Sequence, residues 1–376
     1  MSKGGRFEKK KQRSSKKIAL IVACVVAASV LGMVAFAATY VNGMLNDVNY
    51  VEVASVVEEQ PISMAAKLEP VAQEAAVVTV AEETTKVENI AKAEIAAKAE
   101  KPAEKGELMN FLIVGKPIWE DGKRLTKTLL LCTLDTGSKA VTLTPLQENA
   151  LVEAPAYKNY AGGQVTLGSV YAMGSAYGNG TAGSMEFMNK TLYKNFGIEV
   201  DKNFEMDMQV LARIVTRLGF VKIELTEAEA AYLSEAMKKE VKSGEQEMNG
   251  TMAREFIKMW ADEEAEGIDS LIGQKKIFNG ILQKIRSEYI MSLEPIARET
   301  MPSITTSMTQ SEFEYFMISM VPMLRKMNFE SGDACPAEFE AQMMDLDGDG
   351  TEEEVLTFNA EQVTKVMRAL TEGEQE

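Results

Sequence analysis

The middle of the chain alternates short apolar runs with amphipathic segments of helical period. The runs at 109–115, 126–134 and 140–144 ("MNFLIVG", "TKTLLLCTL", "AVTLT") predict buried strands, and the last two are separated by an Asp-Thr-Gly-Ser turn. Shorter strands are expected within 203–207 and 221–225. Because strands and helices alternate along this part of the chain, the sequence predicts one α/β (α+β) domain.

Helix signals accompany this pattern. Apolar side chains recur at helical spacing through 184–196, and Gly197 suits a C-cap. Capping boxes at Thr226–Glu229 and Thr309–Glu312 predict two helix starts. Further helices are expected within 208–220, 249–261, 270–290 and 359–376.

The first 41 residues have a different pattern. Residues 1–17 hold eight Lys/Arg and one Glu, and residues 18–41 hold no charge over 24 positions. An apolar helix of about 20 residues spans a bilayer, and the basic flank predicts a cytoplasmic N-terminus. We therefore expect a basic cytoplasmic tail (1–17), an uncleaved transmembrane signal anchor (18–41) and a C-terminal domain outside the cytoplasm. The alternative is a cleaved signal peptide, since Ala35-Phe36-Ala37 matches a cleavage pattern.

Residues 42–108 read as a linker, rich in Ala, Glu, Lys and Val, and they have no aromatic residue after Tyr50. Such a composition does not support an independent core. Parts of it favour a helical spacer that holds the domain away from the membrane. The expected domain follows at 109–300, with a C-terminal extension and an acidic tail at 301–376.

Composition removes several classes of chemistry. The net charge is -16, so nucleic acid is not an expected partner. The absence of histidine rules out Ser-His-Asp triads, Cys-His dyads and His-metal sites. Of the three cysteines, Cys24 lies in the apolar segment, and Cys132 reads as a small core residue. The alternative for Cys132 is a disulfide with Cys335.

From about Met109 to about Ile290, the chain resembles the LytR-CpsA-Psr family of cell-envelope enzymes. The resemblance is carried mainly by "FGIEVDKNFEMD" (196–207) and by Met248-Asn249-Gly250 with Ala253 and Phe256. It implies a central mixed sheet flanked by helices, with a long apolar pocket for a polyprenyl tail. It also implies transfer of a glycopolymer, such as wall teichoic acid or capsule, from a polyprenyl pyrophosphate carrier to peptidoglycan. Arginines would hold the pyrophosphate, and carboxylates would hold Mg²⁺.

Most of the charged positions implied by the resemblance are replaced. Where the family has Asp before Thr at the start of its first long strand, this chain has Lys127. The family's Pro-Arg-Asp at the next strand end is Pro145, Leu146 and Gln147. Its Lys-Ile-Asn is Thr166, Leu167 and Gly168 here.

The same holds in the second half of the domain. The family's Tyr-x-Arg-x-Arg reads Phe256, Lys258 and Trp260. Its Arg-x-x-Arg-Gln reads Ser270, Gly273 and Gln274. The degenerate catalytic positions are therefore Lys127, Leu146, Gln147, Ser270 and Gly273. The remaining candidate ligands for a phosphate are Lys258, Gln274, Lys127 and Arg124, with Lys123, Lys275 and Lys276 as nearby cations that could substitute.

These replacements leave the activity open. The favoured interpretation is a non-catalytic or regulatory relative that keeps the polyprenyl-phosphate pocket and acts in assembly of a Gram-positive-type envelope. The alternative is an active glycopolymer–peptidoglycan phosphotransferase with divergent ligands and Mg²⁺. Expected partners are the membrane and a polyprenyl (pyro)phosphate lipid or cell-wall glycopolymer.

An acidic loop near the C-terminus offers a separate hypothesis. Asp345, Asp347, Asp349 and Gly350 match positions 1, 3, 5 and 6 of a calcium loop, but Leu356 stands at position 12. The sequence thus predicts either a Ca²⁺ site at 345–353 or a plain acidic turn between two strands. A calcium-tuned sensor head on a stalk is the third and weakest interpretation of the whole chain.

Overall fold

The computed structural model describes residues 45–54, 108–120, 123–259, 270–288, 294–316, 326–348 and 350–372. All of them belong to one of the chain's two compact units, formed by 45–70 and 105–376. No helix in these ranges is long and apolar enough to cross a membrane, and the expected anchor at 18–41 lies outside them.

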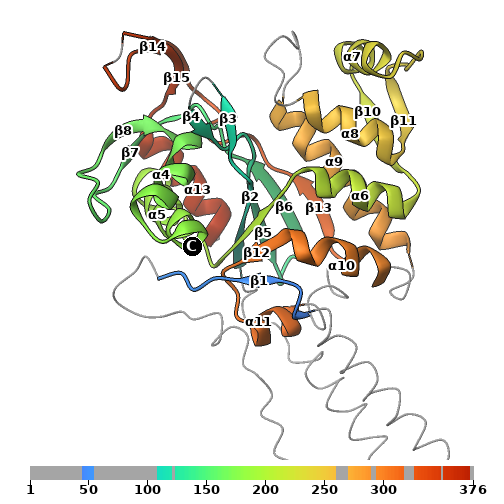
Figure 1. Cartoon of the computed structure of the whole chain (residues 1–376), viewed down its shortest axis with the longest axis horizontal. Coiled ribbons are helices and arrows are strands. Elements are labelled where there is room, and N and C mark those ends of the chain that lie inside the picture. The colour runs from blue at the N-terminus through green and yellow to red at the C-terminus, as the bar shows by residue number, and fades with distance from the viewer. Residues whose placement is uncertain are drawn as a thin grey trace, which may run out of the picture. The chain divides into compact units, whose positions relative to one another are not determined.

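A seven-stranded mixed sheet forms the centre of this unit (Figure 1). Its strands, in spatial order, are β1 (Asn49–Tyr50), β12 (Ile304–Thr306), β9 (Lys202–Met206), β2 (Leu108–Gly115), β5 (Leu129–Asp135), β6 (Ala140–Pro145) and β13 (Asn328–Ser331). β2, β5 and β6 are antiparallel neighbours, whereas β9 pairs with β2 and β13 pairs with β6 in parallel. The predicted central mixed sheet is confirmed.

Nine helices cover or extend this sheet in the described ranges. They are α4 (Leu167–Tyr177), α5 (Gly180–Phe196), α6 (Gln209–Leu218), α7 (Glu227–Met237), α8 (Gly250–Lys258), α9 (Ser270–Ser287), α10 (Glu294–Thr300), α11 (Gln310–Tyr315) and α13 (Ala360–Glu372). A short 3₁₀ helix, η3 (Met301–Ser303), precedes β12. Figure 1 shows α4, α5 and α13 on one side of the sheet and α6, α9 and α10 on the other.

Four two-stranded ribbons lie outside the sheet. They pair β3 (Ile118–Glu120) with β4 (Lys123–Leu125), β7 (Leu151–Ala154) with β8 (Gly163–Thr166), β10 (Val221–Leu225) with β11 (Gly244–Met248), and β14 (Glu340–Met344) with β15 (Glu353–Thr357).

The core on the α4–α5 side follows from the register of β2 and β5. Leu112 faces Leu131 and Val114 faces Leu129, which places apolar rows side by side. Fully buried Met185, Met188 and Phe196 of α5 pack on this side. Gly197 ends the helix with φ of 68°, as its C-cap position requires. These methionines therefore act as core side chains.

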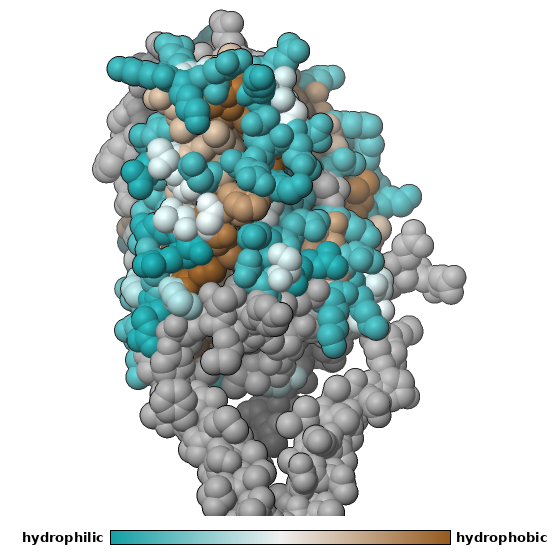
Figure 2. All heavy atoms as spheres, turned by 90° about the vertical axis from the view of Figure 1, so that its right-hand side faces the viewer, coloured by the Kyte–Doolittle hydropathy of each residue, from teal (hydrophilic) through white to brown (hydrophobic). Residues whose placement is uncertain are grey.

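The other side is covered by amphipathic helices. α6 buries Val210, Leu211 and Val215 and leaves its polar residues outward. Figure 2 looks onto the side that carries these helices and shows a mostly hydrophilic surface with smaller hydrophobic areas. Both predicted capping boxes form, at Thr226–Glu229 of α7 and Thr309–Glu312 of α11.

The structure corrects one expectation and excludes one alternative. Residues 45–54, at the start of the expected linker, are docked on the sheet, where β1 pairs with β12 in parallel. The alternative disulfide does not form, because Cys132 and Cys335 are both free. Burial raises the pKa of each thiol to about 12, which keeps both side chains neutral and unreactive.

Candidate functional site

The end of β6 is where the resemblance places the charged strand-end motif. We define the strand-end site as Thr126, Lys127, Leu146, Gln147, Glu148, Gly168 and Gln274. Backbone hydrogen bonds join its parts: Thr126 N donates to Gly168 O (2.9 Å), Gly168 N donates to Glu148 O (2.6 Å), and Leu146 N donates to Leu129 O (2.8 Å). These bonds connect the segments that contain Thr126, Gly168 and Glu148, and they join Leu146 to Leu129 of β5.

Leu146 points into the core. Its side chain is fully buried in the same cluster as Leu129, Leu131 and Cys335. The segment after β13 covers this strand end, because Cys335 N donates to Pro145 O (2.8 Å) and Gln147 N donates to Cys335 O (2.9 Å). The position that corresponds to the family's arginine is therefore occupied by a core side chain.

Gly168 leaves little space for the side chain that the family has at this position. A Cβ atom placed there would lie 3.1 Å from each of Glu148 Cβ, Glu148 O and Thr126 O. These distances are shorter than ordinary van der Waals contacts, and two of the three neighbours are backbone atoms. The family's asparagine at this position could not enter without displacing the backbone.

Gln274 is the residue that the family has at this position, but its side chain is bonded to the protein backbone. It is fully buried on α9, and its Nε2 donates to Lys127 O at 3.0 Å. Its Oε1 accepts no hydrogen bond within the described ranges, and the same is true of the buried Thr126 Oγ1 and Thr144 Oγ1. These orphaned acceptors are neutral hydroxyl and amide oxygens.

The nearby cations are already engaged. Lys276 Nζ forms an ion pair with Glu229 at 2.7 Å, and the Glu229 side chain is 3% exposed. Lys275 Nζ donates to Gly332 O. Lys258, at the exposed end of α8, pairs with Glu255 one turn earlier at 2.9 Å. The predicted phosphate ligands Lys258 and Gln274 therefore both have partners within the protein.

The other predicted positions are placed as follows. Lys127 is half-buried before β5, Ser270 begins α9, and Gly273 is buried within α9. Arg124 lies opposite Trp119 on the β3–β4 ribbon, and its side chain is outside the described structure. Phosphate binding by Lys258, Gln274, Lys127 and Arg124 therefore stays a prediction.

The strand-end site holds a single carboxylate, where the resemblance implies more than one for Mg²⁺. Mg²⁺ is bound through one or two carboxylates together with substrate phosphates and water. Glu148 is the single carboxylate among the defined residues. Asp135, at the opposite end of β5, is used by its own turn, where it accepts bonds from Gly137 N (2.8 Å) and Ser138 Oγ (2.6 Å). Burial works to raise the pKa of Asp135, but these hydrogen bonds lower it below its usual value.

The acidic loop joins β14 and β15, as the plain-turn interpretation expected. Asp345 accepts hydrogen bonds from Gly348 N (2.8 Å) and Gly350 N (3.0 Å). Within the described part of the chain, no three His, Cys, Asp or Glu side chains are grouped to hold a metal. Asp349 lies outside that part, so calcium binding by Asp345, Asp347 and Asp349 stays a prediction.

A pocket of about 800 Å³ opens beside the strand end. It runs from Thr144 and Gly332 along α13, and none of the predicted ligand residues lines it. Its apolar lining comes mainly from Cys335, Pro336, Phe339, Phe358, Val363, Val366, Met367 and Leu370. Its volume is typical of sites for small organic ligands. No role could be predicted for α13 from its sequence, because this pocket arises from contacts between segments that are distant in the chain.

Comparison with known proteins agrees with the fold. The model of the LytR_cpsA_psr family matches residues 74–338, more than half of the chain. No curated protein matches significantly. Among solved structures, protein gbs0355 from Streptococcus agalactiae aligns with a TM-score of 0.55 at 17% identity, covering 72% of this chain and 90% of that one.

TagT of Bacillus subtilis aligns with a TM-score of 0.51 at 14% identity, covering 73% of this chain and 92% of that one. The structure described as TagT bound to LI-WTA aligns with a TM-score of 0.52 at the same identity and coverage. At these identities the similarity establishes a common fold. With the family model spanning most of the folded unit, the chain belongs to the LytR-CpsA-Psr family.

Proposed function

We propose that this protein is a membrane-anchored, extracytoplasmic member of its family that takes part in cell-envelope assembly without catalysing phosphotransfer. Residues 18–41 would form its single membrane span, with the N-terminus in the cytoplasm. The observation that carries the proposal is the strand-end site, where Leu146 and Gln274 are fully buried and the nearby Lys275 and Lys276 already have partners.

Transfer of a pyrophosphate-linked polymer concentrates negative charge on phosphate oxygens, which requires free cations or a metal. At this site, Leu146 supplies only apolar surface, and Gln274 is bonded to Lys127 O. Lys276 could bind a phosphate only by leaving Glu229, which would strand a nearly buried carboxylate. Binding a phosphate through Lys276 would therefore break the contact between α7 and α9.

Lipid binding does not depend on those charges. A polyprenyl tail is recognised by apolar surface, and its binding energy grows with the area removed from water. Membership of the family, together with a fold relative described as bound to LI-WTA, supports a lipid-linked glycopolymer as the class of partner. The protein would hold or present such a molecule to other components of the envelope.

The test separates binding from turnover. Full-length protein in detergent is titrated calorimetrically with a short polyprenyl pyrophosphate, with and without Mg²⁺, and release of phosphate is followed in parallel. An active member of the family serves as the positive control. We expect saturable binding that is insensitive to Mg²⁺, and no release above background. Metal-dependent release would refute the non-catalytic assignment, and absence of binding would refute retention of the lipid site.

A further inference from the structure

Residues 45–54 are integrated into the folded domain. Asn49 and Tyr50 pair in parallel with Thr305 and Thr306, and Val51 N donates to Thr306 O at 2.9 Å. Asn49 Nδ2 donates to Ile304 O (3.2 Å), and Tyr50 OH donates to Leu45 O (2.9 Å). This segment therefore adds an edge strand to the central sheet.

Apolar burial supports the same docking. Leu45 is fully buried and Val48 is 5% exposed. Val51 and Val53 pack partly against the α4–α5 core, and the Tyr50 ring meets Phe313 edge-on at 6.3 Å. Burial of one such aliphatic side chain contributes about 1.5–3 kcal/mol. Four of them, with the strand pairing, can hold the segment in place without help from a covalent continuation.

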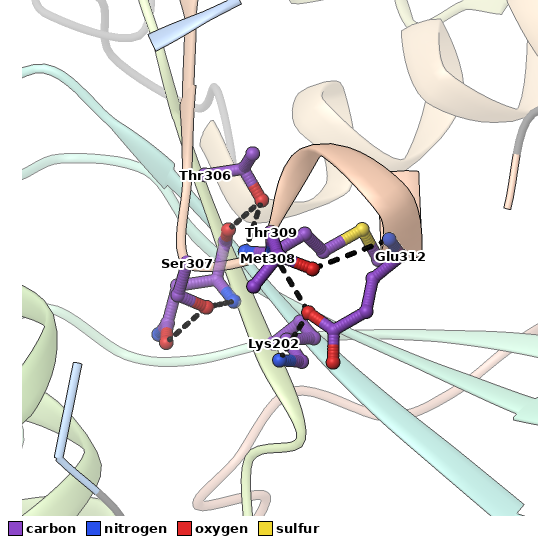
Figure 3. Close-up of polar contacts among 7 residues, drawn as sticks. Lys202, Thr306, Ser307, Met308, Thr309 and Glu312 are labelled. Atoms are coloured by element: carbon purple, nitrogen blue, oxygen red, sulfur yellow. Dashed lines mark hydrogen bonds and ion pairs between the residues drawn. The ribbon is translucent and has the colours of Figure 1, made fainter. Parts of the chain in front are cut away.

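The surface that receives β1 is itself braced (Figure 3). Lys202 Nζ of β9 contacts Glu312 Oε2 of α11 at 2.9 Å, and both side chains are mostly buried. Thr306 Oγ1 donates to Asn203 O at 2.9 Å, which fixes β12 on β9. The edge strand thus docks on a corner whose elements are tied together by polar contacts.

Residues 45–54 follow the predicted membrane span closely in the sequence. Only residues 42–44 separate Leu45 from the apolar stretch 18–41. A fully extended chain of that length reaches about 14 Å. Residues 55–107, in contrast, lie between β1 and β2 in the sequence. They are bracketed by two strands of one sheet.

We propose that residues 45–54 hold the domain directly at the membrane, because the docked segment begins within about 14 Å of the end of the predicted span. The proposal rests on the membrane anchor of the proposed function. Residues 55–107, which connect β1 to β2 in the sequence, then do not set the distance between the domain and the membrane. If they were a flexible tether, they would place the domain at a typical distance of about 40 Å.

The experiment cleaves the chain between β1 and β2. A site for a sequence-specific protease is inserted within residues 75–95 of the full-length protein, and membranes are sedimented before and after cleavage. We expect the cleaved C-terminal fragment to remain with the membrane, because β1 still holds it, and to leave only under denaturant. Release under native conditions would overturn the docking. An uncut protein that fails to sediment would refute the anchor instead.

Two sets of variants make the result specific. Val51→Pro removes the donor to Thr306 O and should release most of the cleaved fragment, whereas Ala54→Pro, at an exposed position of the same segment, should not. A cysteine pair, Asn49→Cys with Thr305→Cys, sits at paired positions in the register. Oxidation should link the two cleaved fragments in a gel without reductant. Failure to cross-link in folded protein would contradict the docking independently of sedimentation.

Discussion

At the scale of single residues, the strand-end site combines family scaffold with replaced chemistry. The sequence showed which charges are missing, since Leu146 and Gln147 are read directly from it. The pairing of Lys258 with Glu255 was also readable, because side chains three apart share a helix face. The pairing of Lys276 with Glu229 was not, because 47 residues separate the partners. No local pattern encodes such a contact.

The first prediction concerns Leu146, which replaces the family's arginine. Restoring the charge with Leu146→Arg should not restore phosphotransfer, because the side chain would enter the core beside Leu129 and Leu131 rather than solvent. An unpaired buried charge destabilises a fold by about 3 kcal/mol or more. Thermal unfolding of the full-length protein should show a large fall in melting temperature.

Leu146→Met is the matched control, since it keeps volume and polarity and should cost less than about 1.5 kcal/mol. If Leu146→Arg melted like the control while gaining Mg²⁺-dependent phosphate release, the position would be at an open site mouth. The assignment of Leu146 to the core would then be wrong.

At the scale of elements, α7 and α9 are joined by one carboxylate. Glu229 accepts from Thr226 N (2.7 Å) in the capping box that begins α7, and it also binds Lys276 of α9. The capping box was predicted, but the ion pair between Glu229 and Lys276 was not. α9 in turn carries Gln274, which donates a hydrogen bond to Lys127 O, two residues before β5. Glu229 therefore helps to fix the helix that lines the strand-end site.

The second prediction tests that coupling. Glu229→Gln keeps the shape of the capping side chain and removes its charge, so the ion pair with Lys276 is lost. A double-mutant cycle with Lys276→Met should give a coupling of about 1–2 kcal/mol in unfolding free energy, below the cost of breaking a fully buried pair because Lys276 is 21% exposed.

The exposed pair Glu255–Lys258 provides the comparison. The same cycle on Glu255→Gln and Lys258→Met should give only about 0.3–0.5 kcal/mol, as expected for neighbours on an exposed helix face. Equal couplings for the two pairs would show that burial of Glu229 adds nothing to the contact between α7 and α9.

At the scale of the whole molecule, elements distant in sequence form the two edges of the sheet. β1 begins one edge and β13 ends the other, and both pair in parallel with their neighbours. The antiparallel β5–β6 hairpin could be predicted because its turn is local. The edge strands could not be predicted. Parallel strands are joined by long crossover connections, so no single segment of the sequence shows which strands pair or in which register. β1 was also hard to predict because it lies at the start of an Ala/Glu/Lys-rich stretch.

The last prediction concerns acid stability of the corner that receives β1. Burial works to raise the pKa of Glu312, but the hydrogen bonds and charge of Lys202 and the capping contacts of Thr309 outweigh it and lower that pKa. A carboxylate with a lowered pKa stabilises the fold above its unfolded pKa of about 4.3, and this contribution is lost as the pH falls through the lowered value.

Melting temperatures of the full-length protein and of Glu312→Gln should therefore differ most at pH 7, by an amount that corresponds to about 1–2 kcal/mol for a charge-assisted contact. The difference should begin to narrow below about pH 4.3, where the carboxylate of the unfolded chain becomes protonated. It should be smallest once the pH has fallen through the lowered native pKa, because the protonated native side chain resembles the amide. Glu227→Gln, on an exposed glutamate of α7, should shift melting little at either pH. A gap between wild type and Glu312→Gln that stayed constant down to pH 3 would mean that the contact with Lys202 does not depend on the charge of Glu312.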